Sequence, residues 1–108
     1  MNPALPKTSV VVRKQIKNSN WHFIYLLESK VKDWIYIGCT NNLNKRLMEH
    51  KQGKMFSTRK MLPVELIYFE AYRSKDIAFE REKSLKKYGS ALARLKSRIG
   101  ITKKGRAG

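Results

Sequence analysis

The sequence is poor in cysteine and has no long apolar run, and both absences exclude classes of protein. One thiol, Cys39, cannot form a disulfide within the chain or build a cysteine-rich zinc site. No apolar run approaches the roughly 20 residues of a membrane-spanning helix. Residues 1–20 also lack the apolar stretch of a signal peptide. We therefore expect a soluble, cytoplasmic protein in a reducing compartment, without membrane contact.

Acidic residues are equally scarce, with 8 Asp and Glu against 24 Lys and Arg and a net charge of +16. A two-metal nuclease site gathers several carboxylates from different elements, which this chain can hardly supply. The segment Glu28-Ser29-Lys30 mimics half of the PD-(D/E)xK nuclease signature, but no acidic residue precedes Glu28. The basic excess instead favours a polyanionic partner, DNA or RNA, and nothing in the composition calls for a small-molecule cofactor.

What is present is enough apolar sequence, 42% of 108 residues, for one folded domain. Aromatic and branched runs at 23–27, 34–39 and 64–71 predict three strands, the first two forming a hairpin. Helical spacing follows at 43–51, from Ser74 or Asp76 to about Tyr88, and at 91–100. The sequence thus predicts an α+β fold in ββαβαα order, a three-stranded, mainly antiparallel sheet packed with helices. Thr40 and Asn41 are expected to cap the first helix.

The domain boundaries are expected at the changes in composition. Residues 21–100 would form the folded domain. Residues 1–20, which are basic and contain Val10-Val11-Val12, would be an arm or an extra strand, and residues 101–108 a basic tail.

Two tyrosines and two helix residues stand out within this framework. In strands, side chains alternate between faces, so Tyr25 points away from Ile24 and Leu26. Tyr36 likewise points away from its isoleucine neighbours. On the first helix, His50 falls on the apolar stripe and Arg46 lies beside it. A basic residue and a histidine on the buried side of a helix require a specific role.

The order of these residues resembles the GIY-YIG nuclease family. The two motifs are Phe23-Ile24-Tyr25 and Tyr36-Ile37-Gly38, followed by Arg46 and His50. The resemblance continues through 63–68 and 78–85, where the family carries a metal-binding glutamate, here Glu82. It extends over roughly residues 21–98 and is strongest to small single-domain bacterial and phage members. Phe23 replaces the motif glycine, and no asparagine follows Glu82.

The resemblance implies a Mg²⁺-dependent endonuclease that hydrolyses phosphodiester bonds, with Mn²⁺ as a substitute. Tyr25 or Tyr36 would assist the attacking water, Arg46 would clamp the phosphate, and Glu82 would hold the metal. His50 would be a further catalytic residue, which hydrogen-bonds a tyrosine hydroxyl or assists proton transfer. One carboxylate suffices for a single Mg²⁺ because water and phosphate oxygens complete its octahedron. The substrate would be double-stranded, single-stranded or branched DNA, with RNA as a further option. In the family one of these phenols accepts the proton of the attacking water, directly or as phenolate, and nearby cations such as Arg46 would favour the phenolate.

Each of these residues also has a structural alternative. The tyrosines could simply pack in the sheet, and His50 could be a hydrogen-bonded core residue. Arg46 could pair with Glu49. Glu82, on the inward stripe of its helix, could pair with a nearby cation, for which the candidates are Arg46, Arg81 and Lys86.

The loop from Lys54 to Lys60 combines cations, an aromatic ring and two hydroxyls. This mixture suits contacts to a nucleic-acid backbone, and we expect Lys54, Arg59 and Lys60 to bind phosphate. The alternative is a polar loop with Phe56 turned inward. For the whole chain, the alternative function is a basic DNA- or RNA-binding module that has the fold without catalysis.

Overall fold

The computed structural model describes residues 21–87 and 89–101 and confirms the ββαβαα order. Its elements are β1 (His22–Ser29), β2 (Ile35–Thr40), α1 (Leu43–Lys51), the 3-10 helix η2 (Arg59–Met61), β3 (Val64–Tyr72), α2 (Lys75–Lys87) and α3 (Gly89–Ile99). The predicted N-terminal arm (1–20) and all but the first residue of the predicted basic tail (101–108) lie outside the described ranges. Within residues 21–87 and 89–101, no helix has the length and apolar character that crossing a membrane requires.

The central strand of the sheet is β1, which pairs antiparallel with β2 on one side and β3 on the other. Tyr25 lies opposite Gly38 of β2 in this register. On the β3 side the register shifts between Leu26 and Leu27, which pair with Tyr68 and Leu66, so β3 carries one extra residue there. Because β1 is covered on both faces and both edges, its middle reads as a continuous apolar run.

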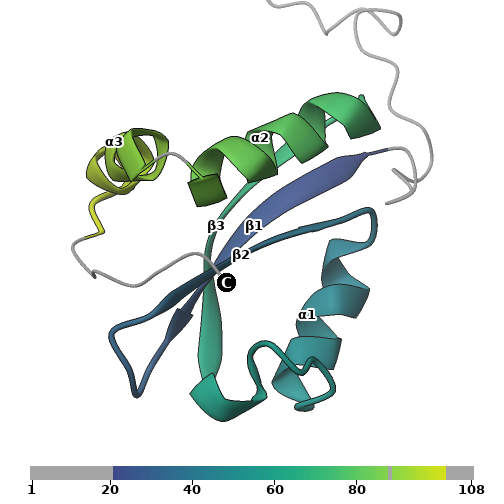
Figure 1. The fold of residues 1–108 in the computed structure, drawn as a ribbon. Helices are drawn as coiled ribbons and strands as arrows, with labels where there is room; N and C mark the ends of the chain where they lie inside the picture. The colour runs from purple at the N-terminus through teal and green to yellow at the C-terminus, as the bar shows by residue number, and fades with distance from the viewer. Residues whose placement is uncertain (1–20, 88, 102–108) are drawn as a thin grey trace, which may run out of the picture.

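Helices cover both faces of this sheet, with α2 and α3 on one side and α1 on the other (Figure 1). The face under α2 and α3 holds the larger core, formed by Ile24, Leu26, Ile35, Ile37, Ala78, Leu85 and Leu95. The face under α1 buries Tyr25, Leu27 and Leu43, with Tyr36 and Leu47 packed beside them. The predicted alternation is confirmed: the two motif tyrosines share the α1 face, opposite their isoleucine neighbours.

The ends of the helices show which capping predictions hold. Asn42, and neither Thr40 nor Asn41, caps α1, because its Oδ1 accepts the N–H of Lys45 at 3.1 Å. Thr40 instead accepts the N–H of Asn42 at 3.0 Å and shapes the turn before the helix. Ser74 caps α2 by accepting the N–H of Ile77. Helix α1 is followed by Gly53 at φ +77, a conformation that favours glycine.

Candidate active site

The centre of the site is Tyr25, whose ring is fully buried between β2 and α1. A Cβ at Gly38, its partner on β2, would lie 2.4 Å from Tyr25 Cζ and 2.5 Å from its hydroxyl oxygen. Real contacts of this kind do not occur at such distances, so only glycine leaves room for the phenol. Tyr25 and Gly38 therefore form one structural unit, although 12 residues separate them in sequence.

A chain of hydrogen bonds leads inward from this phenol. The Tyr25 hydroxyl lies 2.8 Å from His50 Nε2, and His50 Nδ1 lies 2.7 Å from Thr58 Oγ1. The exposed fractions of Tyr25, His50 and Thr58 are 0%, 1% and 0%. The His50 ring also meets the rings of Tyr25 and Tyr36 edge-on, at centroid distances of 5.6 and 5.2 Å. The predicted bond between His50 and a tyrosine hydroxyl is present, and it joins β1, α1 and the following loop.

Burial sets the protonation states of this pair. Burial, followed by the charge of the neighbouring Tyr36, raises the pKa of Tyr25 well above its ordinary value, and hydrogen bonding and charge from Arg46 only partly oppose this. The pKa of His50 is lowered, first by burial and then by Arg46, with Glu49 acting in the opposite direction. At neutral pH the pair is a phenol and a neutral imidazole. Desolvation outweighs the cations at Tyr25, which favours a route through the neutral phenol over one through a phenolate.

Arg46 lies at the mouth of the site on α1. Its Nε contacts Glu49 Oε1 at 3.2 Å, so the ion pair considered as an alternative role is present. The Arg46 side chain is 33% exposed and opens on a polar pocket of about 160 Å³, whose remaining lining is Thr40, Asn41, Asn42, Lys45 and Glu49. A guanidinium has five N–H donors, so an ion pair through Nε is compatible with an oxyanion on the terminal nitrogens.

Glu82 approaches the sheet from the opposite face. Its side chain is 21% exposed, and its carboxylate pairs with Lys86 at 3.1 Å, one turn along α2. This is one of the expected alternatives, while Arg81 pairs with Glu70 instead. Burial, followed by Glu82, raises the pKa of Cys39, and Lys86 and Arg46 lower it. Glu82 and Arg46 therefore both act on a thiol of β2, an edge strand of the sheet.

The donor set at Glu82 limits which metal these residues fit. Within residues 21–87 and 89–101, no three His, Cys, Asp or Glu side chains gather around one point. This arrangement does not suit zinc, which takes four protein ligands in structural sites and three in catalytic ones. One carboxylate does suit Mg²⁺, which keeps several waters and takes further oxygens from a phosphate. The residues present fit a hydrated divalent cation on Glu82.

The loop after α1 partly departs from expectation. Lys54, Arg59 and Lys60 are exposed, as phosphate contacts would require. Phe56 is 82% exposed with the Arg59 guanidinium 5.5 Å from its ring centroid, so the inward-turned alternative is wrong. Thr58, one of the two hydroxyl residues of this loop, is buried against His50. Sequence reasoning missed this role because nothing in the pattern distinguishes Thr58 from its neighbour.

Comparison with known proteins gives the same family as the sequence motifs. Residues 21–96 match the model of the GIY-YIG catalytic domain. The chain is 38% identical over 87 residues to the UPF0213 protein YazA of Bacillus subtilis, covering 80% of this chain and 83% of that one. It is 42% identical over 66 residues to a UPF0213 protein of Streptococcus pyogenes, covering 60% and 71%.

Among solved structures, the solution NMR structure of the UPF0213 protein BH0048 from Bacillus halodurans is similar, with a TM-score of 0.43 and 31% identity. The match covers 70% of this chain and 85% of that one. The family match extends over the whole described domain except its last few residues, and it includes both tyrosine motifs and Glu82. The chain belongs to the GIY-YIG family of nucleases.

Proposed function

We propose that this protein is a Mg²⁺-dependent endonuclease that hydrolyses phosphodiester bonds in DNA, with Mn²⁺ as a working substitute. The observation that carries the proposal is the buried contact of 2.8 Å between the Tyr25 hydroxyl and His50 Nε2, beside Arg46. A phenol that keeps its proton cannot take one from water unless it passes its own onward. A neutral imidazole in hydrogen-bond contact supplies that acceptor.

The proposed step is a single displacement at phosphorus. The water oxygen forms a bond to phosphorus as its proton moves to the Tyr25 oxygen, and the Tyr25 proton moves to His50 Nε2. The bond from phosphorus to the 3′-oxygen breaks, which leaves a 5′-phosphate and a 3′-hydroxyl once solvent protonates the departing oxygen. Tyr36, whose ring centroid is 6.1 Å from that of Tyr25, helps to keep bulk water from the relay.

Positive charge for the growing phosphate dianion would come to the edge strand β2 from the helices beside it. Arg46 reaches this edge from α1 and presents a planar fork that matches two phosphoryl oxygens. A divalent cation on Glu82 would supply further positive charge to the phosphate and the departing oxygen. Lys54, Arg59 and Lys60, exposed on the loop after α1, would hold the flanking backbone without reacting.

The test compares Glu82→Ala with Glu80→Ala on plasmid, single-stranded and branched DNA and on RNA, with Mg²⁺ or Mn²⁺. Both variants remove one carboxylate from α2, but Glu80 is exposed and lies off the inward face. We expect Glu82→Ala to lose at least about 10²-fold in single-turnover rate, equivalent to about 2.7 kcal/mol. Glu80→Ala should cleave like the wild type, and neither change should weaken DNA binding.

Other outcomes would redirect the assignment. Full activity of Glu82→Ala would remove Glu82 from the metal site. A wild type that binds DNA tightly but cleaves none of these substrates with either metal would be a non-catalytic binding module. Cleavage confined to RNA would replace the proposed substrate and keep the chemistry.

A further inference from the structure

Thr58 is a buried hydroxyl whose position is fixed by the backbone around it. Its N–H donates to the carbonyl of Met55 at 3.2 Å, and its carbonyl accepts the N–H of Met61 at 2.8 Å. These bonds hold the turn between α1 and η2 with the side chain directed at His50. The 2.7 Å separation of Thr58 Oγ1 from His50 Nδ1 is a short, fully buried hydrogen bond.

The two bonds of His50 fix one another. A neutral imidazole has one N–H donor and one lone-pair acceptor, so its two nitrogens take opposite roles. Tyr25 keeps its proton, and in the proposed reaction that proton passes to His50 Nε2, which lies 2.8 Å from the hydroxyl. With Nε2 as the acceptor, the imidazole proton lies on Nδ1, which donates it to Thr58 Oγ1, 2.7 Å away.

We infer that Thr58 is a positioning residue for the proposed reaction, which holds His50 in the Nδ1-protonated tautomer so that Nε2 accepts a proton from Tyr25. The inference rests on the proposed function. A threonine orients the ring without adding charge. The groups that face His50 are Tyr25 from β1, Tyr36 from β2, and Arg46 and Glu49 from α1. A carboxylate in place of Thr58 would raise the pKa of His50.

The direct test is the tautomer itself, measured by ¹⁵N NMR at neutral pH without substrate. The chain has two histidines, His22 and His50, so a His22→Gln variant isolates the His50 signals. We expect the wild type to show a protonated Nδ1 and an unprotonated Nε2. Thr58→Val removes the acceptor at nearly constant volume and should shift His50 toward the other tautomer, whereas Thr58→Ser should keep the wild-type pattern. A wild-type spectrum with a protonated Nε2 would overturn the inference, even if the valine variant does not fold.

The kinetic arm uses single-turnover cleavage by the same variants across pH. Thr58→Val should be slower by about 10- to 100-fold at unchanged KM, less than the loss expected for removing the proton acceptor itself. Its pH profile should shift, and Thr58→Ser should restore both rate and profile. A uniformly slower valine variant with an unchanged tautomer and pH profile would show a purely structural role and overturn the inference. If the wild type cleaves nothing, the proposed function fails, and the spectrum alone decides whether Thr58 sets the tautomer.

Discussion

Gly38 and Tyr25 face each other across the β1–β2 pair, and the phenol occupies the volume that any side chain at position 38 would need. This close approach is what allows Tyr25 to be fully buried and still place its hydroxyl against His50. The hydroxyl position therefore depends on the absence of a methyl group on the neighbouring strand.

Gly38→Ala tests this dependence. The added Cβ would lie 2.4 to 2.8 Å from three Tyr25 atoms, so the ring must move. We expect a loss of about 1–3 kcal/mol in the free energy of unfolding, as for other overpacked cores, together with slower cleavage as Tyr25 leaves His50. Urea denaturation and single-turnover rates measure the two effects.

The matched control is Gly89→Ala, because a Cβ there meets nothing within 4 Å at the start of α3. Alanine suits a helix better than glycine, so this variant should be at least as stable as the wild type. Equal stability of Gly38→Ala and the wild type would show that the ring is freer than the structure indicates.

The sequence identifies some site residues better than others, for physical reasons. Alternation along each strand is sufficient to turn Tyr25 and Tyr36 away from their aliphatic neighbours, and helical periodicity is sufficient to turn His50 inward. The direction of the Tyr25 pKa shift does not follow from these patterns, because it depends on how completely β2 and α1 enclose the ring. Thr58 is unpredictable for a related reason, since its contact with His50 is made by the path of a loop.

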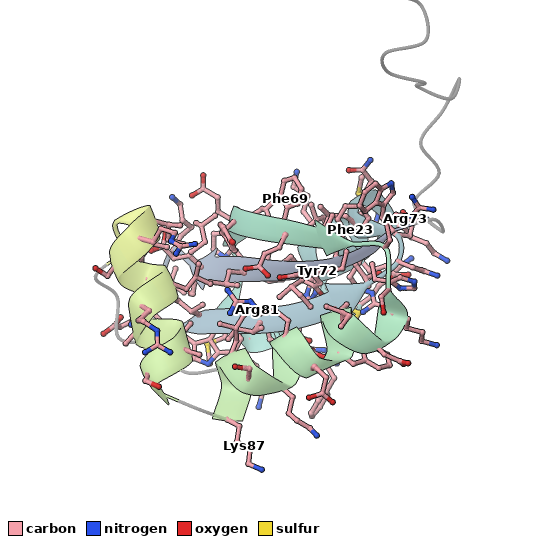
Figure 2. All side chains as sticks on the ribbon, turned by 90° about the horizontal axis from the view of Figure 1, so that it is seen from above. Phe23, Phe69, Tyr72, Arg73, Arg81 and Lys87 are labelled. Carbon is pink, nitrogen blue, oxygen red and sulfur yellow. The ribbon has the colours of Figure 1, made fainter. Side chains whose placement is uncertain are left out.

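At the scale of elements, α2 is fixed to the edge strand β3 by a polar cluster centred on Glu70. The Glu70 carboxylate accepts Arg81 Nε–H at 2.9 Å and Nη2–H at 2.8 Å, and the hydroxyls of Tyr68 and Tyr72 donate to the same group. Arg81 extends from α2 over the strands toward Tyr72 (Figure 2). Because Arg81 directly precedes Glu82, this cluster sets the rotation of α2 and the direction in which Glu82 points.

Glu70→Gln tests the anchor through its pH dependence. Burial acts to raise the pKa of Glu70, but hydrogen bonds from Arg81, Tyr72 and Tyr68 outweigh it and hold the pKa below its usual value of 4.5. A depressed pKa means that the charged group stabilises the fold above pH 4.5, and that this contribution is lost as the pH falls through the folded-state pKa. We expect the variant to be less stable than the wild type by about 1–3 kcal/mol at pH 7.

That difference should narrow as the pH approaches 3, which urea denaturation at pH 7, 5 and 3 would reveal. Glu65→Gln is the control, because it breaks only the exposed pair of Glu65 with Lys30, which solvent screens. A Glu70→Gln deficit that stays constant from pH 7 to 3 would mean that the ionised carboxylate is not what anchors α2.

The order of elements could be predicted because each has its own periodicity and its own turn residues. The prediction fails for features that depend on contacts between elements distant in the sequence. The extra residue of β3 opposite Leu26 and Leu27 is one example, since nothing in its apolar sequence marks a bulge. The pairing of Glu70 with Arg81 is another, because it depends on how α2 lies across the strands and not on spacing.

At the scale of the whole molecule, we expect the positive charge to make DNA binding strongly dependent on salt. Beyond Glu82 the sequence has nine lysines and arginines and no acidic residue, within a net charge of +16. If binding neutralises about six phosphates, affinity for DNA should fall on the order of 10³-fold between 50 and 200 mM salt, because the bound counterions are released. Fluorescence anisotropy over a salt series measures the slope.

Removing residues 102–108 takes away three cations and is the control. The truncated chain should show a shallower slope and cleave DNA at an unchanged single-turnover rate when DNA is saturating. A nearly flat salt profile of the full chain would mean that its positive charge does not contact the nucleic acid backbone.

The two-faced central strand also restricts how this protein can change in length over evolution. Because successive side chains of β1 serve opposite cores, inserting or deleting one residue before Tyr25 would turn the phenol toward α2 and drive an aliphatic side chain against His50. One event would damage the site and the main core together. The turn at residues 30–33 is exposed and contributes to neither core. Insertions and deletions among relatives should therefore accumulate in that turn and spare β1.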